Sequence, residues 1–203
     1  MKIICIGRNY VDHIRELNNV IPGEPVFFLK PDTALLIRNR PFYYPSFSTD
    51  IQYELELVLR VSKVGKHIQK QFASTYFDEI GLGLDMTARD LQENAKKKSL
   101  PWAVAKGFDQ SAPISRFIPV TRFSDFSNIS FRLDLNGKTV QKGNSGLMIY
   151  SFDDIITHIS NYITLRTGDL VFTGTPAGVG PVKIGDVLEA YLEGEKVLKC
   201  EIK

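Results

Sequence analysis

Residues 52–60 read Q-Y-E-L-E-L-V-L-R, and this alternation of side chains is typical of a β-strand. Successive side chains of a strand point to opposite faces, so Glu54 and Glu56 are predicted to share one face, opposite Tyr53 and the leucines. Two neighbouring carboxylates repel each other unless a cation, such as a divalent metal ion, lies between them. The stretch also fits the solvent-facing side of an antiparallel strand, and taken alone it favours that simpler interpretation.

Length and composition indicate an ordinary globular protein. The chain has 203 residues, of which 43% are hydrophobic and 24% are charged, and its formal net charge is +2. This length suits one substantial core, so we predict a single domain over residues 1–203. The basic run Lys96–Lys98 is too short to indicate binding to nucleic acid. Apolar runs stay far below the roughly 20 residues that span a bilayer, so no membrane partner is expected either.

The two cysteines and the amino terminus bear on the cellular compartment. Cys5 and Cys200 each lie in an apolar strand pattern, near opposite ends of the chain, and buried free thiols are expected rather than a disulfide. The apolar core of the amino terminus is far too short for a secretory signal. Both observations predict a cytoplasmic location.

Strands are predicted to dominate the chain, and the helices between them do not alternate regularly with strands. This pattern predicts one compact, strand-rich α+β domain rather than a doubly wound parallel sheet. The expected helices include one starting at Thr87, with Asp90 as its capping-box partner, and one capped by Ser151 and Asp154. The other predicted helices lie within residues 8–19 and, weakly, within residues 68–77. A hairpin turn is expected at residues 136–137, and three or four closing strands are expected after residue 168. The remaining predicted strands lie at residues 2–6, 25–30, 52–60, 79–86, 102–108 and 129–135.

A third acid, Asp85, follows a predicted buried strand and precedes a predicted helix. It could be an ordinary helix cap. Together with Glu54 and Glu56 it forms an all-oxygen ligand set, which selects Mg²⁺ or Mn²⁺ and leaves positions for water or substrate. Three carboxylates and one divalent ion are still net negative, so an anionic substrate needs further cations nearby.

Arg89, Lys106 and Lys30 are the candidates for those cations. Arg89 lies one helical turn beyond Asp85, whereas Lys106 and Lys30 lie in or at the end of apolar segments. A lysine is not buried cheaply unless it is paired. Lys106 at the solvent-exposed end of a strand is an equally good interpretation.

Two further features could take part in chemistry. His13 and Glu16 are three residues apart on a predicted helix, so the glutamate could orient the imidazole as a general base. Such pairs are common on exposed helices, and alone this one favours the structural interpretation. The segment T-G-T-P-A-G-V-G-P at 173–181 could offer backbone N–H groups and the Thr175 hydroxyl to a carboxylate, or it could be a plain turn.

Taken together and in order, these segments resemble the fumarylacetoacetate hydrolase superfamily, in particular its small acylpyruvate hydrolase and oxaloacetate decarboxylase branch. The resemblance covers nearly the whole chain and implies a mixed β-sandwich roll with a few short helices, usually a homodimer. The segments that carry it are G-R-N-Y-V-D-H (7–13), F-L-K-P (28–31), E-L-E-L (54–57), L-D-M-T-A-R-D (84–90), K-K-K-S-L-P-W (96–102), A-K-G-F (105–108) and T-G-T-P-A-G-V-G (173–180).

The resemblance also implies roles for individual residues. The metal ligands for Mg²⁺ or Mn²⁺ fall on Glu54, Glu56 and Asp85. The contacts to a small anionic 2-oxo acid fall on Arg89, Lys106 and Thr175, with Gln92 close by. The catalytic pair falls on His13 and Glu16, within a mobile lid at residues 7–19. Lys30 stays a candidate for substrate binding from its position at the end of an apolar segment.

The activity implied is metal-dependent cleavage of a C–C bond in an acylpyruvate, giving pyruvate and a carboxylic acid, with decarboxylation of oxaloacetate as a possible second reaction. In both, pyruvate enolate forms at the metal. The same type of site also serves isomerases, tautomerases and hydratases, and a binding module without turnover is a further alternative. The sequence departs from its relatives at Gln52-Tyr53, where histidine is common, and at Asp32, where a small polar residue is common.

Overall fold

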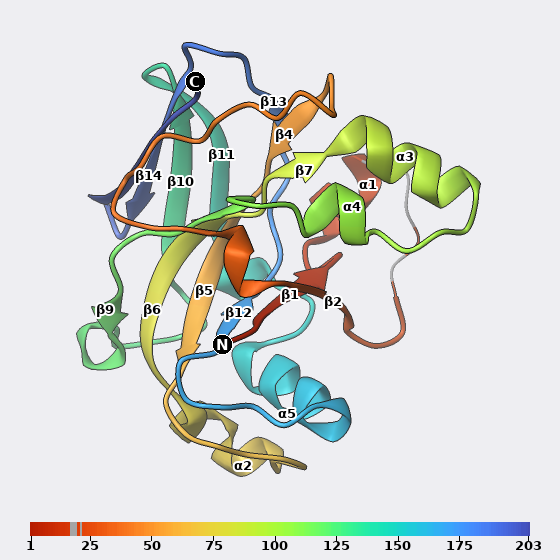
Figure 1. The fold of residues 1–203 in the computed structure, drawn as a ribbon. Coiled ribbons are helices and arrows are strands. Elements are labelled where there is room, and N and C mark those ends of the chain that lie inside the picture. The colour runs from red at the N-terminus through yellow and green to blue at the C-terminus, as the bar shows by residue number, and fades with distance from the viewer. Residues whose placement is uncertain (17–19, 21) are drawn as a thin grey trace.

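A six-stranded mixed sheet forms the centre of the computed structural model, which describes residues 1–16, 20 and 22–203 (Figure 1). The strand order is β2-β1-β12-β5-β6-β9; β1 and β12 run parallel, and the other neighbours run antiparallel. The strands are β1 (Ile3–Gly7), β2 (Val26–Lys30), β5 (Leu55–Val61), β6 (Phe77–Leu84), β9 (Ile118–Pro119) and β12 (Leu170–Phe172).

A second, antiparallel sheet packs against the first through contacts of β10 with β5 and of β14 and β15 with β6. It has the order β11-β10-β14-β15, and two smaller sheets have the orders β13-β4-β7 and β3-β8. The strands of the second sheet are β10 (Ser130–Leu135), β11 (Lys138–Asn144), β14 (Val187–Leu192) and β15 (Glu195–Glu201); those of the small sheets are β3 (Leu35–Leu36), β4 (Ile51–Tyr53), β7 (Thr87–Ala88), β8 (Ala112–Pro113) and β13 (Gly180–Pro181).

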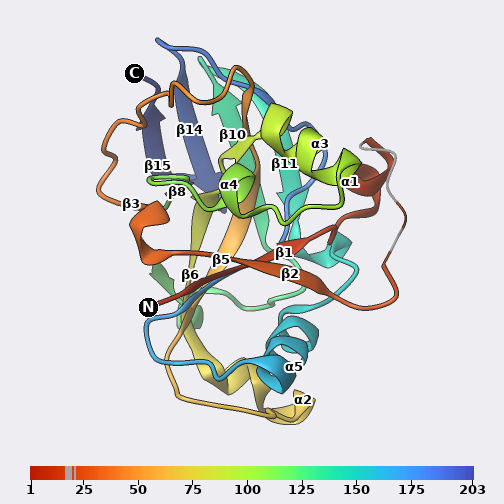
Figure 2. The same ribbon diagram turned by 45° about the vertical axis from the view of Figure 1, so that its right-hand side comes forward.

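The helices are short and lie at the margins of the sheets. Figures 1 and 2 place α1, α3 and α4 on one side of the molecule and α2 and α5 together at one end. No described helix is both long and apolar enough to cross a membrane. The α-helices are α1 (Val11–Glu16), α2 (Lys70–Ala73), α3 (Arg89–Lys97), α4 (Ala103–Lys106) and α5 (Phe152–Tyr162); 3₁₀ helices cover Asp32–Ala34, Ser74–Tyr76, Val120–Arg122 and Ser145–Leu147.

The two faces of β5 have different surroundings. Leu55, Leu57 and Leu59 are fully buried in the large apolar cluster that the two sheets share. Val58 points the other way, into a small second cluster with residues of β1 and β12. Glu56 shares this second face because it is two residues from Val58. A carboxylate is thereby buried at the end of an apolar patch.

Several sequence predictions are confirmed. The strand-rich α+β fold is present, and the hairpin turn joins β10 to β11. Ser151 and Asp154 form the predicted capping box at the start of α5. Cys5 and Cys200 are free and buried, and burial raises the pKa of the Cys200 thiol to about 12.

The predicted strand over residues 52–60 is in fact two strands with a break at Glu54. β4 belongs to a small sheet, whereas β5 belongs to the central sheet. The Leu55 N–H donates to Oε1 of the Gln141 side chain at 2.9 Å, and the carbonyl of Glu54 accepts from the Asp85 N–H at 2.8 Å. The chain changes sheets at this point, a change that alternation of side chains does not reveal.

The predicted strand at residues 102–108 is wrong, because Ala103–Lys106 forms the helical turn α4. Its backbone closes through hydrogen bonds from the Lys106 N–H to the Trp102 carbonyl at 2.9 Å and from the Gly107 N–H to the Ala103 carbonyl at 2.7 Å. A short apolar run without alternation fits a buried helix as well as a strand.

The predicted capping box at Thr87 and Asp90 is also wrong. Thr87 belongs to β7, and α3 begins at Arg89 after an N-cap, Ala88, that makes no side-chain hydrogen bond. The helix predicted within residues 8–19 is shorter, since α1 covers Val11–Glu16; residues 17–19 lie outside the described part of the chain.

Candidate metal and substrate site

Three buried carboxylates converge where β4, β5 and β6 meet. Glu54 lies in the break between β4 and β5, Glu56 is the second residue of β5, and Asp85 directly follows β6. The antiparallel register of β5 and β6 pairs Leu55 with Leu84, which brings Asp85 beside Glu54. One ligand atom from each acid lies within 4.8 Å of the others. The structure therefore brings together the acids that the sequence analysis selected.

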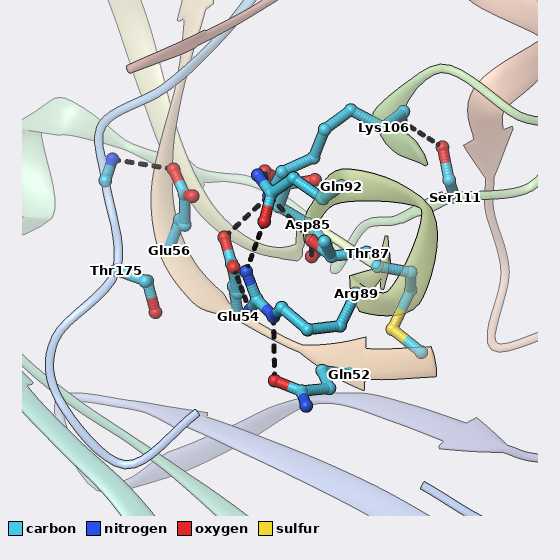
Figure 3. A network of polar contacts seen from close by, with 12 residues as sticks. Gln52, Glu54, Glu56, Asp85, Thr87, Arg89, Gln92, Lys106, Ser111 and Thr175 are labelled. Atoms are coloured by element: carbon cyan, nitrogen blue, oxygen red, sulfur yellow. Dashed lines mark hydrogen bonds and ion pairs between the residues drawn. The ribbon is translucent and has the colours of Figure 1, made fainter. Parts of the chain in front are cut away.

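Two cationic side chains reach these carboxylates from α3 and α4 (Figure 3). Lys106 Nζ lies 2.8 Å from Glu54 Oε2 and 2.7 Å from Asp85 Oδ2, and it donates to Thr87 Oγ1 at 2.6 Å. Arg89 Nη2 lies 2.6 Å from Glu54 Oε1. Lys106 is buried and paired, so of its two interpretations from the sequence the structure supports the buried one and not the solvent-exposed end of a strand. Thr87, which the sequence analysis took for a helix cap, instead anchors the Lys106 ammonium group.

Lys30 contacts the Asp85 oxygen that Lys106 does not. Its Nζ lies 2.8 Å from Asp85 Oδ1 and donates to Ser111 Oγ at 2.9 Å, to the Met86 carbonyl at 3.3 Å and to the Lys106 carbonyl. The side chain is fully buried and is not part of the cavity wall. Lys30 thus holds Asp85 and α4 in place from behind.

The three acids are not equivalent electrostatically. Burial alone would raise the pKa of Glu54, but the positive charges of Lys106 and Arg89 outweigh burial and hold the pKa of Glu54 well below its ordinary value. Burial raises the pKa of Glu56, and the charges of Asp85 and Glu54 raise it further. Glu56 Oε2 accepts from the Gly174 N–H at 2.6 Å, a partner without formal charge.

These observations fit a divalent cation. The donors are carboxylate oxygens, which Mg²⁺ and Mn²⁺ prefer, and they are close together and buried. Glu56 is the acid whose negative charge the protein compensates least, and a bound cation would lower its pKa. Glu54, Glu56 and Asp85 are thus the residues that could hold the metal.

His13 and Glu16 form the predicted pair on α1. His13 Nδ1 lies 3.3 Å from Glu16 Oε2, and His13 lines the cavity above the carboxylates. Glu16 also accepts from the Gly178 N–H, at 3.1 and 3.2 Å to its two oxygens. Burial lowers the pKa of His13, while Glu54 and Glu16 offset this in part. The imidazole is therefore neutral at pH 7, with Nε2 as the nitrogen that Glu16 does not hold.

Two glutamines that the sequence analysis did not assign to the site position its polar groups. Gln52 Oε1 accepts from Arg89 Nε at 2.9 Å, and the predicted residue Gln92 accepts from Arg89 Nη1 at 2.6 Å. Gln141 donates to Thr175 Oγ1 at 2.9 Å, so it links the 173–181 segment to the start of β5. Gln52 appears in the sequence only as a departure from its relatives, and Gln141 lies on a distant strand without a recognisable local pattern.

A single cavity borders most of the predicted site residues. Its wall contains His13, Glu54, Glu56, Asp85, Arg89, Gln92, Lys106 and Thr175, together with Ile6, Gly7, Arg8, Phe28, Lys96 and Trp102. Glu16 and Lys30 lie behind this wall, each bonded to a residue that forms it. The arrangement provides carboxylates for a cation, a cationic and amide surface for an anion, and a neutral imidazole.

The chain matches a known family and known proteins over nearly its whole length, which includes every residue of the site. The family model described as fumarylacetoacetate (FAA) hydrolase C-terminal matches residues 2–203. The chain is 45% identical to the mitochondrial oxaloacetate decarboxylase of Dictyostelium discoideum over 194 residues, which are 95% of this chain and 89% of that protein. It is 41% identical to the mitochondrial oxaloacetate tautomerase FAHD1 of Bos taurus over 201 residues, 99% of this chain and 91% of the relative.

A solved structure shares the fold in full. The fumarylpyruvate hydrolase of Pseudomonas aeruginosa, in complex with Mn²⁺ and pyruvate, superposes with a TM-score of 0.94 at 34% identity, covering 100% of this chain and 89% of that one. The mixed sandwich described above is thus the fold that the sequence resemblance implied. The presence of Mn²⁺ in that protein agrees with the acidic cluster of this one.

Proposed function

The chain belongs to the fumarylacetoacetate hydrolase family, and from this premise we propose that it is a Mg²⁺- or Mn²⁺-dependent enzyme that acts on oxaloacetate and related 2-oxo acids. The observation that carries the proposal is the buried triad of Glu54, Glu56 and Asp85, with Lys106 and Arg89 beside it and His13 across the cavity. Relatives named as oxaloacetate decarboxylase and oxaloacetate tautomerase support this substrate.

The site residues have different roles in the proposed reaction. Glu54, Glu56 and Asp85 would hold the metal ion, which supplies Lewis acidity and positive charge when bound. Arg89 and Lys106 place positive charge beside the carboxylate and the 2-oxo oxygen of the substrate. Burial lowers the pKa of Lys106, but Asp85 and Glu54 outweigh burial and raise it overall, so the ammonium group stays charged. That charge favours electron density moving onto the 2-oxo oxygen.

Two reactions of oxaloacetate use this charge. In decarboxylation the bond from C3 to the distal carboxyl carbon breaks, CO₂ leaves, and the electron pair forms pyruvate enolate. In tautomerisation a base removes a proton from C3, and the resulting enolate oxygen takes up a proton, from the protonated base or from water, to become an enol hydroxyl. His13 Nε2 can accept the C3 proton because the imidazole, whose pKa lies below the ordinary value, is neutral at pH 7.

A second candidate function is hydrolysis of acylpyruvates, which the His13–Glu16 pair favours. His13 takes a proton from water, the resulting hydroxide attacks the distal carbonyl carbon, and the C–C bond between that carbon and C3 breaks. The products are a carboxylic acid and the enolate of pyruvate. We also propose that the described part of the predicted lid, residues 7–16, closes over the cavity, which would exclude bulk water and position the base.

A direct assay tests the proposal. The purified protein with Mg²⁺ or Mn²⁺ is expected to accelerate the enol–keto exchange of oxaloacetate, its conversion to pyruvate, or both. Ultraviolet absorbance follows the enol, and a coupled reaction follows pyruvate. Acetylpyruvate, assayed in parallel, tests hydrolysis. Failure to accelerate any of these reactions with either metal would contradict the proposal.

The Lys106→Met variant is expected to lose roughly 2–5 kcal/mol of transition-state stabilisation, the range for removing one partner of a buried charge pair. This loss is measured as the fall in kcat/KM. Metal affinity should not fall, because removing a cation makes the triad more negative. Lys97→Met is the matched control, since Lys97 is exposed on the neighbouring helix. Thermal unfolding checks the fold, and an unchanged kcat/KM in Lys106→Met would remove Lys106 from the reaction.

A further inference from the structure

One face of α3 lines the cavity from end to end. Arg89, Gln92 and Lys96 all border it, and their spacing of three and four residues places them on one side of the helix. Arg89 is held at the carboxylate end by Glu54. Lys96 lies seven residues further on, which is about 10 Å along the helix axis at 1.5 Å per residue. The helix thus presents two cations to the same cavity, one at each end.

Two aromatic rings form the wall between Lys106 and Lys96. The Lys106 ammonium group lies 5.3 Å from the centroid of the Phe28 ring, and Phe28 packs edge-on against Trp102 with centroids 6.1 Å apart. The Lys96 ammonium group lies 5.7 Å from the Trp102 centroid. Both rings and both lysines border the cavity. A cation therefore stands at each end of an apolar wall made of two rings packed edge to face.

The cavity has an inner end at the three carboxylates and an outer end at Lys96, and the positive charges at these ends differ in their ion pairing. At the inner end, three carboxylates face three cations, namely Lys30, Arg89 and Lys106, so a divalent metal would leave two positive charges in excess. At the outer end, Lys96 forms no ion pair with any carboxylate of the described residues, and Arg8 borders the same cavity. Partial burial lowers the pKa of Lys96, and the charges of Arg89 and Arg8 lower it further. Lys96 therefore places a positive charge at the outer end, and the inner end would also be positive once a divalent cation is bound.

We propose that Lys96 binds the second carboxylate of a 2-oxo diacid, and that it makes the enzyme prefer diacids to neutral acylpyruvates. The first carboxylate and the 2-oxo group would occupy the inner end, and the flat enolised part of the chain would lie along Phe28 and Trp102. This inference rests on the proposed function, because it places the 2-oxo group at the triad. Trp102 holds the Lys96 ammonium group over the cavity by a cation–π contact.

Binding of two matched ligands tests the inference without turnover. 2-Oxoglutarate is a 2-oxo diacid, and 2-oxopentanoate has a methyl group in place of its second carboxylate. Calorimetry with the Mg²⁺-loaded wild-type protein is expected to show about tenfold tighter binding of the diacid, as a hydrogen bond to a charged group contributes. In Lys96→Met this preference should fall to within about twofold, whereas Lys97→Met should retain it.

Kinetics provide the second measurement. Lys96→Met should raise KM for oxaloacetate about tenfold and leave KM for acetylpyruvate unchanged, and circular dichroism should show a native fold. Equal binding of both ligands by the wild type, or a preference that survives in Lys96→Met, would overturn the inference and leave the proposed function intact. If the wild type binds the diacid preferentially but turns over no 2-oxo acid, the proposed function fails instead. If the wild-type protein binds neither ligand, the inference and the proposed function both fail.

Discussion

Exhaustive removal of divalent cations is expected to abolish turnover of every 2-oxo acid substrate, and added Mg²⁺ or Mn²⁺ is expected to restore it. The reason lies in the charges of the site. The positive side chains next to the triad are engaged by Glu54 and Asp85, while the one hydrogen bond that Glu56 accepts from the described residues comes from the Gly174 N–H. Without a metal ion the triad has no Lewis acid to offer a substrate, and Glu56 remains a poorly compensated buried acid.

The measurement combines activity with thermal unfolding. Mg²⁺ or Mn²⁺ should raise the melting temperature of the chelated protein, because a ligand that binds only the folded state stabilises it. Glu56→Gln retains the shape of the side chain but removes its charge, so this stabilisation should shrink. Glu93→Gln, on the exposed side of α3, is the matched control and should respond to metal as the wild type does. Full activity after exhaustive chelation would rule out a metal-dependent reaction.

The second large effect is expected from His13→Ala. Loss of a positioned general base costs about 10²–10⁴-fold in rate, and hydrolysis of acetylpyruvate should fall by this factor. Tautomerisation of oxaloacetate should fall similarly, because it also needs a proton acceptor. Decarboxylation should fall less, since the carbon–carbon bond breaks without removal of a proton. Glu16→Ala should show the same pattern more mildly, because the imidazole remains but loses its orienting partner.

The pH profile provides an independent measurement. His13 acts as a base only when neutral, and its pKa lies below the ordinary value of about 6.5, chiefly because of burial. Hydrolysis should therefore be constant near pH 7 and fall as the pH drops through a value below 6.5. His13→Ala should lack this fall, and His158→Ala, on α5, should retain it. Wild-type rates of hydrolysis in His13→Ala would show that α1 has a structural role only.

Much of the site could be predicted because the sequence patterns that indicate it each span only a few neighbouring residues. Glu54 and Glu56 are two residues apart in an alternating segment, and Asp85 stands where an apolar strand ends, so both features can be recognised within a few residues. Motif resemblance then linked these segments to His13 and Glu16. The structure places all five close to one cavity, although their catalytic roles remain predictions.

The errors arose where tertiary contacts decide the local structure. The break at Glu54 depends on the Gln141 side chain, which comes from β11 and replaces a strand partner for Leu55. The turn α4 forms from an apolar run that lacks any period, and its Lys106 is drawn inward by Glu54 and Asp85. Both outcomes depend on residues far apart in sequence, so no short stretch of the chain is enough to predict the break at Glu54 or the turn α4.

The hydrogen bonds of Glu16 couple the position of α1 to the orientation of the His13 imidazole. Glu16 holds His13 with one oxygen and the Gly178 N–H with both, so the same side chain orients the imidazole and fastens α1 to the 173–181 segment. Any movement of α1 that admitted a substrate would break these bonds and withdraw the imidazole at the same time. If α1 is the proposed lid and His13 the proposed base, substrate exchange and proton abstraction would be separated in time, because the imidazole would lose its orienting partner whenever α1 moved away.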